Sequence, residues 1–523
     1  MFFRREHISL SNKSSEIYNK LIDINSDLCL IKKEFDFSFI YDEIEENYCL
    51  DNGRNSIDGV IALRAIFIQK YFGLNDRQLE RKAKFDMEIK YFLDIEIDEQ
   101  AFDFTTIWYF KKMIGEEKTN SIFNNILAQI KEKGIIKSFR RQAIDTIPIV
   151  AAAALPSITT LIYQAIKGVC NTVADDILIE IFAETKLTKE ELDQYSKARP
   201  LFRSEDDEKI KAFQKSAKMG FRVLDIVHTH QLKSEEITLL EEILQDNVRP
   251  QKNEEFQRKF TEHTKKSLVD KDATLGHKTK EDVIYGYKVG VSVIPEGIIT
   301  AYETTSMSHR DDEHLIPLLN KQEKNGTKCE ETDADSAFGF IHNFVDAERK
   351  NVVLHAPLRN FDPEKLSVYD FEYNKEKQEL TCTNNITVKG RYSGALSFEF
   401  PLKTCRICPK ADTCPLARSK VATLNKNHET ARKAIERQRE DKAINKQNRE
   451  NGIKNFKRLV VENVFAFLEK LGIKITPAYS LKMTKVHVGI IITLSNMLKT
   501  IRLIKKQNQT RVTLSLSSKL SYY

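Results

Sequence analysis

Three carboxylates in this chain of 523 residues lie where metal-dependent chemistry on a phosphodiester needs them. Asp145 stands inside the apolar, β-branched run 142–149, Asp335 follows a short acidic segment, and Glu462 lies among apolar residues at helical spacing. Burying a carboxylate is costly unless it is paired or binds a cation. Three converging carboxylates would hold two divalent cations, one activating the attacking oxygen and the other stabilising the leaving oxygen. Taken singly, a strand-end aspartate is more often a turn or cap residue.

A second group of residues suited to metal binding is the cysteine cluster Cys405, Cys408 and Cys414. The C-x-x-C spacing is typical of metal ligands, and Cys382 or His428 would be the fourth. The functional interpretation is a structural zinc ion that stiffens an insertion contacting DNA. The alternative is a reduced, partly buried cysteine loop.

The spacing of apolar residues along the sequence predicts the strands and helices that position the carboxylates. The run around Asp145 predicts a strand, and residues 285–293 alternate before a turn at 295–297 and a second strand at 298–305. A further apolar run lies at 352–354, and the residues around Glu462 repeat at helical spacing. These elements predict an α/β fold.

The N-terminal part predicts short helices. Residues 57–72 have helical spacing and end at Gly73, Asn75 caps a second helix with Arg77 and Arg81, and 87–93 suggests a third. This unit is either a helix-turn-helix DNA reader or a helical bundle with a solvated basic face. Residues 151–265 predict charged amphipathic helices, with a capping box at 188–191, which we interpret as an insertion or a partner surface.

Charge is distributed unevenly along the chain. The net charge is 82 − 76 = +6, but residues 401–523 carry 26 − 8 = +18, which leaves 56 − 68 = −12 for residues 1–400. Clustered Lys and Arg favour a polyanion, so nucleic acid is the first expected partner, and the segment 403–458 predicts a surface for the DNA backbone. A solvated helix face is the alternative there.

Several classes of protein are excluded by composition. The most apolar stretches, 147–155 and 486–494, are shorter than the ~18 residues that a membrane span needs, and the N-terminus lacks the apolar core of a signal peptide. Eight cysteines in so long a chain do not make a secreted disulfide framework. A soluble cytosolic protein is expected.

The motifs, taken in order, resemble bacterial insertion-sequence transposases of the DDE class, in the branch with an InsH-like N-terminal domain. The resemblance covers most of the chain apart from residues 151–265. It is carried by Asn52-Gly-Arg54, Tyr71-Phe-Gly-Leu-Asn-Asp-Arg77, Phe102-Asp-Phe-Thr-Thr106, Ala143-Ile-Asp-Thr146, Asp270-Lys-Asp-Ala-Thr-Leu-Gly-His-Lys278, Tyr285-Gly-Tyr-Lys288, Asp335-Ser-Ala-Phe-Gly339 and Arg458-Leu-Val-Val-Glu462.

The resemblance implies a ribonuclease-H-like catalytic core, a mixed β-sheet with helices, which brings Asp145 and Asp335 to adjacent strand ends while a helix supplies Glu462. The expected domains are a helical N-terminal DNA-binding domain (1–135), the core (136–150 and 266–360), a helical insertion (151–265), a cysteine-containing insertion with a basic segment (361–450), and the catalytic helix with the end of the core (451–523).

The resemblance also implies cofactors and partners. Asp145, Asp335 and Glu462 would bind Mg²⁺ or Mn²⁺ and catalyse DNA strand cleavage and strand transfer at the terminal inverted repeats of the element. The partners would be double-stranded DNA of the element ends and the target, and a second copy in a synaptic homodimer, in the cytoplasm at the nucleoid and away from membranes. DNA contacts are expected from Arg77, Arg81, Lys288 and Arg458. Arg458 is four residues before Glu462 and so on the same helical face, and the alternative is that it forms only an ion pair within the helix.

The sequence departs from the family pattern at two places. Related transposases often have Lys seven residues after the glutamate and Tyr three before the arginine, where this chain has Glu469 and Asn455. The second motif also offers Asp333, but the residues that follow Asp335 match the family. Two rival functions follow: a catalytically inactive, transposase-derived DNA-binding protein, and a ribonuclease-H-like nuclease unconnected with transposition. A helix-turn-helix regulator would leave the carboxylates unexplained.

Overall fold

A computed structural model describes residues 2–4, 10–48, 56–153, 155–197, 205–252, 255–259, 267–277, 282–359, 361–393, 395–424, 427–451 and 456–520, with the backbone alone described at 393, 395, 449, 456–459 and 510–520. The motif Asn52-Gly-Arg54 and residues Cys49, Lys278 and Asn455 lie outside these ranges. Helices and mixed sheets alternate along the chain, which confirms the predicted α/β class.

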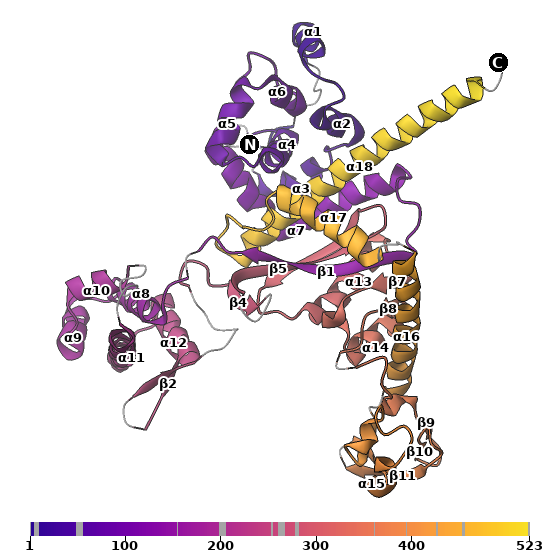
Figure 1. The fold of residues 1–523 in the computed structure, drawn as a ribbon. Helices are drawn as coiled ribbons and strands as arrows, with labels where there is room; N and C mark the ends of the chain where they lie inside the picture. The colour runs from indigo at the N-terminus through magenta and orange to yellow at the C-terminus, as the bar shows by residue number, and fades with distance from the viewer. Residues whose placement is uncertain are drawn as a thin grey trace.

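Helices dominate the N-terminal part of the chain (Figure 1). They are α1 (Asn12–Leu21), α2 (Asp27–Glu34), α3 (Ile40–Ile44), α4 (Gly59–Phe72), α5 (Asp76–Phe85), α6 (Met87–Leu93) and α7 (Phe104–Glu132). The predicted boundaries at 57–93 are confirmed: Gly73 ends α4 with φ 64°, and Asn75 and Gln78 form a capping box at the start of α5. Every residue from Gly59 to Gln69 is buried, so α4 is the centre of this unit and presents no face to a ligand.

The largest sheet in the described residues has six strands. They are β1 (Arg141–Val150), β4 (Thr274–His277), β5 (Val283–Val293), β6 (Ile299–Ser306), β7 (Glu331–Asp333) and β8 (Val353–His355). The order is β5-β1-β7-β8, with β4 and β6 both paired to β5. Strand β5 is antiparallel to β1, and β7 and β8 are parallel to it. The predicted strand around Asp145 and the predicted hairpin are therefore confirmed.

Two hydrophobic clusters cover the two faces of this sheet. Ile147 and Ile149 of β1 pack with α7, α17 (Phe456–Lys470) and α18 (Leu481–Leu520). Ile144 points the other way, toward α13 (Leu315–Asn325) and α14 (Ile341–Arg349). Because side chains alternate along a strand, every residue of β1 can be assigned to one of these faces.

The inserted helices form a unit with its own core, set apart from the sheet (Figure 1). They are α8 (Ile158–Cys170), α9 (Asp175–Thr185), α10 (Lys189–Tyr195), α11 (Asp206–Thr229) and α12 (Glu235–Asn247), followed by the hairpin β2 (Val248–Pro250) and β3 (Phe256–Arg258). Tyr285 of β5 contacts both ends of this insertion: its carbonyl accepts from the backbone N–H of Ala151 at 3.0 Å, and its hydroxyl donates to the carbonyl of Asp270 at 2.9 Å.

A second, five-stranded sheet lies far from the first one, at the other end of α16 (His428–Glu450) (Figure 1). Its strands are β9 (Glu372–Asn374), β10 (Glu379–Thr381), β11 (Thr387–Ser393), β12 (Ala395–Glu399) and β13 (Val421–Leu424), and α15 (Leu402–Arg406) precedes the cysteine loop. The sequence did not predict this sheet. It has a small core of its own, to which Phe398 and Cys405 belong.

Helix α18 is the one described helix long and apolar enough to cross a membrane, over Leu481–Gln509. Of the apolar window, 78% is buried inside the protein, where it packs against α7, α4 and β6. This burial is what a core helix of a folded domain shows.

Candidate functional site

Asp145 lies in the middle of β1, half-buried, opposite Val291 of β5. Its side chain accepts a hydrogen bond from the backbone N–H of Thr146 at 2.8 Å. Asp145 alternates with Ile144 and shares the parity of Ile147, so it belongs to the face of the sheet that α17 and α18 cover.

Asp335 lies two residues beyond the end of β7. Parallel pairing of β1 with β7 sets Ala143 beside Asp333, and Asp145 and Asp335 each follow this last pair by two residues along their own segments. Asp335 caps the 3₁₀ turn η3 (Ser336–Phe338), accepting from the backbone N–H of Ala337 at 2.9 Å. Neighbouring Ala334 packs in the cluster of Ile144, on the opposite face from Asp145.

The rival position, Asp333, is already paired. Arg141 donates to both of its carboxylate oxygens, at 2.6 and 2.8 Å. A bidentate arginine pair fixes both oxygens of a carboxylate. This contact makes Asp333 a link between β1 and β7 and favours Asp335 as the second carboxylate.

Glu462 is exposed on α17, between the buried residues Val461 and Val464. Helix α17 packs on β1, and Val464 belongs to the same cluster as Ile147, so α17 covers the face that carries Asp145. The side chain of Arg458 lies outside the described residues. Glu469, which stands where related sequences have Lys, forms an ion pair with Lys474 at 2.8 Å.

The three carboxylates do not form a closed coordination shell in the described residues. No three His, Cys, Asp or Glu side chains in the described part of the chain lie close enough together to hold one metal ion. Asp145 lies in β1 and Asp335 in the turn after the neighbouring strand β7, and Glu462 lies on the helix that packs on β1. The donor set of three carboxylates is the oxygen chemistry that Mg²⁺ prefers.

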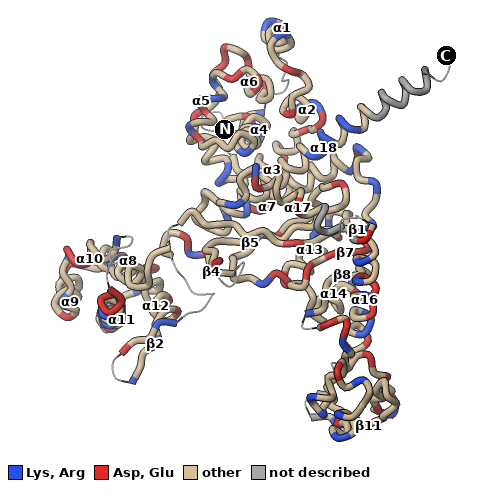
Figure 2. The backbone as a smooth tube through the Cα atoms, in the orientation of Figure 1, with Lys and Arg blue, Asp and Glu red and all other residues tan. Residues whose placement is uncertain are grey.

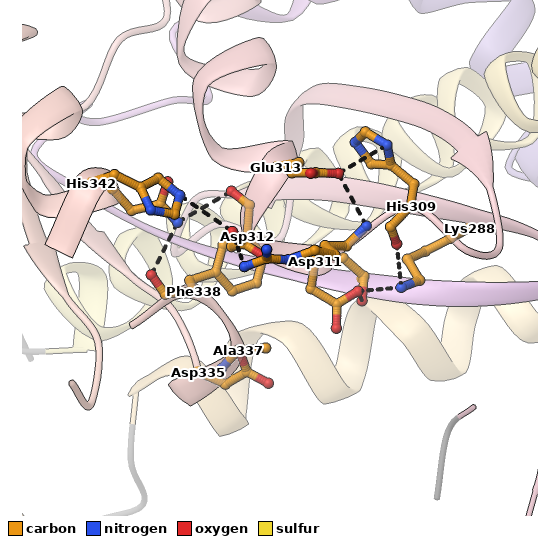
Figure 3. A network of polar contacts seen from close by, with 12 residues as sticks. Lys288, His309, Asp311, Asp312, Glu313, Asp335, Ala337, Phe338 and His342 are labelled. Atoms are coloured by element: carbon orange, nitrogen blue, oxygen red, sulfur yellow. Dashed lines mark hydrogen bonds and ion pairs between the residues drawn. The ribbon is translucent and has the colours of Figure 1, made fainter. Parts of the chain in front are cut away.

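Lys288, a predicted DNA contact, makes two polar contacts within the protein. Its ammonium lies 2.6 Å from Asp311 and donates to the carbonyl of His309 at 2.9 Å, with 12% of the side chain exposed (Figure 3). Asp311 also accepts from the hydroxyl of Thr146, the residue after Asp145, at 3.1 Å. Lys288 therefore holds the segment with His309 and Asp311, which follows β6, beside Thr146 of β1.

A buried network, not predicted from the sequence, holds the turn that carries Asp335 (Figure 3). Asp312 is buried, pairs with both Arg310 at 2.9 Å and His342 at 3.3 Å, and belongs to η2 (Asp311–His314). The side-chain amide of Asn343 donates to the carbonyl of Asp312 at 3.2 Å and to that of Phe338 at 3.0 Å. The only sequence signal was the dense charge at 309–313, which alone does not reveal a partner.

Gly339, the last residue of the motif that begins at Asp335, is required by a close approach of backbone. A Cβ atom there would lie 1.8 Å from the carbonyl oxygen of Pro357. The Gly339 carbonyl accepts from the N–H of Arg359 at 2.8 Å. The segments after β7 and after β8 are thus fixed against each other.

The predicted DNA contacts Arg77 and Arg81 are exposed on α5. The guanidinium of Arg77 lies 5.0 Å from the Phe104 ring, and Lys82 lies 4.6 Å from the Phe72 ring. Trp108 and Tyr109, at the start of α7, are also exposed. The N-terminal unit therefore presents basic and aromatic side chains to solvent at α5 and α7.

Much of the predicted basic segment 403–458 is helix α16, and its charges are of both signs (Figure 2). Several cations are paired within the protein: Lys433 with Glu348 at 2.9 Å, Lys442 with Glu364 at 2.6 Å, and Arg439 with Asp370 at 2.6 Å. These pairs show that part of the basic segment serves the junction between the two sheets.

The four cysteines of the small sheet lie near one another. Burial raises the pKa of the Cys405 thiol, and so do the nearby thiols of Cys414, Cys382 and Cys408. Lys410 links the two loops by donating to the carbonyl of Thr383 at 3.1 Å. The other candidate ligand, His428, packs edge-on against Tyr373, with ring centroids 4.9 Å apart.

Comparison with known proteins identifies one part of the chain. Residues 16–113 match the family model described as "Transposase domain (DUF772)". This span runs from α1 into the start of α7 and supports a transposase family, as the resemblance predicted. No curated protein matches the chain, and no solved structure matches it.

Proposed function

We propose that this protein is a DDE-class transposase that binds the terminal inverted repeats of its insertion sequence and catalyses metal-dependent strand cleavage and strand transfer. The observation that supports the proposal is that Asp145 and Asp335 each follow the paired segment of the parallel neighbours β1 and β7, while α17, which carries Glu462, packs on β1. The transposase domain at residues 16–113 supports DNA of a mobile element as the substrate.

The strand order supports a ribonuclease-H-like core. Three antiparallel strands, β6, β5 and β1, are followed by β7 and β8 running parallel to β1, and α13 and α14 make the crossovers on one face. In this sheet β7 pairs with the first residues of β1, so Asp145, in the middle of β1, and Asp335, after β7, each follow the paired segment by two residues.

The three carboxylates would hold Mg²⁺ or Mn²⁺, which when bound supplies activation of the attacking oxygen and stabilisation of the leaving oxygen. The remaining residues position this site. Asn343 and Asp312 hold the turn of Asp335, and Lys288 holds Asp311 and, through it, Thr146.

DNA is proposed to contact two surfaces. The exposed Arg77 and Arg81 of α5 would contact phosphates, together with the exposed aromatic residues of α7. The basic C-terminal segment, Arg458 included, would lie against the DNA beside Glu462. Joining two element ends requires two protomers, so a homodimer in the cytoplasm belongs to this proposal.

The rival function is that of an inactive DNA-binding derivative, which Glu469 in place of a lysine favours. Nicking of plasmid DNA that carries the gene with its flanking sequence, in Mg²⁺, separates the two. We expect Asp335→Asn and Glu462→Gln each to lower the nicking rate at least about 100-fold, because a lost metal ligand removes several kcal/mol of transition-state stabilisation. Asp346→Asn, in an ion pair on α14, is the matched control and should nick normally. Nicking by the two variants at the wild-type rate would contradict the assignment.

We also propose a structural zinc ion on Cys405, Cys408 and Cys414, with Cys382 as the fourth ligand. Cys405, Cys382 and Cys414 lie in or against one small core, and Cys408 is near enough to raise the pKa of Cys405. Among the described residues these thiols are not drawn together as a metal site, so zinc binding would require their side chains to converge. Thiolates are the ligands that zinc prefers in structural sites. Elemental analysis of purified protein should find about one zinc per chain, lowered in Cys382→Ser and unchanged in His428→Asn. Equal zinc in wild type and Cys382→Ser would contradict the fourth ligand.

A further inference from the structure

A network of charged side chains lies at the parallel edge of the six-stranded sheet, on the face that carries Asp145. Ala143, Asp333 and His355 are neighbours across β1, β7 and β8. Because side chains alternate along a strand and paired residues share a face, His355 and Asp145 are on the same side of the sheet. Leu354, the residue before His355, belongs to the hydrophobic cluster on the opposite side. None of the roles proposed above uses His355.

Both ring nitrogens of His355 face carboxylates. Nδ1 lies 3.1 Å from a carboxylate oxygen of Asp441 on α16, within hydrogen-bond distance. Nε2 is buried and lies 3.6 Å from a carboxylate oxygen of Glu331 on β7. A hydrogen bond between one imidazole nitrogen and a carboxylate fixes the orientation of the ring. His355 therefore links β8 to α16 and faces β7.

Two arginines continue this network to β1. Arg141 donates to both carboxylate oxygens of Asp333 and lies 3.9 Å from the carboxylate of Glu331. Arg140 lies 3.8 Å from the same glutamate. The network thus runs from α16 across β8 and β7 to a residue of β1 four positions before Asp145.

The second half of α16 has little apolar contact to hold it in place. Its buried apolar residues all precede residue 436. Every residue from 436 to 450 whose side chain is described is at least partly exposed. This half of the helix is therefore positioned by polar contacts, such as that of Asp441 with His355, whose side chains are 33% and 16% exposed.

The same half of α16 leads to the helix that carries Glu462. Residues 451–455 alone separate the end of α16 from the start of α17, and five residues span at most about 18 Å when extended. Figure 1 shows the two helices approaching each other at the edge of the six-stranded sheet. A displacement of α16 would therefore change where α17 begins.

We propose that His355 and Asp441 position α17, and with it Glu462, over the sheet. In this role neither side chain touches DNA or a metal ion, because their contact acts by holding the end of α16 against β8. The inference rests on the proposed function for the part that Glu462 has in catalysis. The hold on α17 itself can be measured without DNA, metal or activity.

The first experiment measures amide hydrogen exchange of the full-length protein in EDTA. In His355→Ala and in Asp441→Ala, the amides of residues 460–466 of α17 should exchange about tenfold faster than in the wild-type protein, the effect of one lost hydrogen bond to a charged group. The double variant should add nothing further, because both substitutions break the same contact. Asp441→Asn keeps an oxygen that accepts from Nδ1 and should stay within about threefold of the wild-type protein. Arg432→Ala, which removes an exposed ion pair within α16, is the matched control and should leave exchange in α17 unchanged.

The second experiment measures nicking in Mg²⁺ and, separately, the affinity for the same DNA in EDTA. His355→Ala and Asp441→Ala should lower the nicking rate about tenfold, the lower range for residues that hold a metal ligand in place. Asp441→Asn should nick at close to the wild-type rate, and all variants should bind the DNA equally tightly. A general loss of folded protein would instead lower both the nicking rate and the amount of DNA bound.

Three results would overturn the inference. They are unchanged exchange in α17 of both alanine variants, faster exchange confined to α16, and nicking by both variants at the wild-type rate in a protein that Asp335→Asn inactivates. Asp441 is partly exposed, so Asp441→Ala should fold, and its unchanged DNA affinity verifies this. Nicking by Asp335→Asn at the wild-type rate would contradict the proposed catalytic site, and faster exchange in α17 of His355→Ala would then still support the positioning of that helix.

Discussion

The N-terminal helices α1–α7 and the inserted helices α8–α12 are both helical regions, yet they pack differently. The N-terminal helices share one continuous hydrophobic cluster with the sheet, α17 and α18, in which Ile66 and Ile491 both lie. The inserted helices have a cluster of their own, centred on residues such as Leu240. Helices that share one hydrophobic core belong to one domain. The first cluster contains residues on both sides of residue 135, where the sequence suggested a domain boundary.

The first prediction tests this difference with two fully buried residues. Ile491→Ala and Leu240→Ala each remove apolar volume from a buried site and should cost about 3 kcal/mol of unfolding free energy. The single tryptophan, Trp108, lies partly exposed on α7, a helix of the shared core, so its fluorescence reports on the unfolding of that helix. In urea, Ile491→Ala should lower the midpoint seen by Trp108 fluorescence, whereas Leu240→Ala should lower only part of the helical signal seen by circular dichroism.

A shift of the Trp108 midpoint by Leu240→Ala, equal to that of Ile491→Ala, would mean that the insertion unfolds together with the rest. The comparison between the two regions would then fail. Wild-type protein with coincident fluorescence and dichroism transitions would indicate the same failure without any substitution.

The second prediction concerns the contact between α4 and α18 inside the shared core. Lys70 of α4 lies 2.8 Å from Nδ1 of His487 on α18, and burial lowers the pKa of Lys70 to about 7. Burial also holds the pKa of His487 well below its usual value, so this imidazole is neutral at pH 7. Asp76 and Lys111, paired at 2.6 Å, are the neighbouring charges.

A lysine whose pKa is lowered in the folded state binds its proton more tightly when unfolded. The free energy of unfolding should therefore rise with pH between about 7 and about 10.4. Below about pH 7 Lys70 is protonated in both states, so the full cost of burying its charge destabilises the folded protein. Lys70→Met should raise the unfolding free energy at pH 7 by about 1 kcal/mol, because the relief of burial is partly offset by the lost hydrogen bond to His487. The gain should fade toward pH 10.5. A gain that is independent of pH, measured by urea unfolding across this range, would show that Lys70 is not responsible.

Local patterns in the sequence were sufficient to predict several of the helices and strands that position the candidate site. Gly73 and Asn75 marked helix ends, and the alternation after Tyr285 marked β5, because capping and strand period act over a few residues. The five short strands of the second sheet had no such signal, since three of them have three or four residues and their pairing is decided by a distant core.

At the candidate site, too, contacts between residues far apart in the sequence could not be predicted. The carboxylates Asp145 and Asp335 were predicted from their surroundings, and the pairing of β1 with β7 puts the segments that carry them side by side. The partner of Lys288 was not predictable, because Asp311 is brought to it by the packing of a turn after β6. Asn343 holds the turn of Asp335 from a separate helix, and no spacing in the sequence indicates that contact.

Tyr285, which contacts both ends of the inserted helices, has a consequence for how this chain evolves. The insertion leaves the sheet at Ala151 and returns at Asp270, and one side chain with its own carbonyl holds both points. Material between two points so close in space can be lengthened, exchanged or deleted while β1 and β5 keep their register. The helical unit is therefore free to diverge faster than the sheet, and relatives of this chain should differ most there in length.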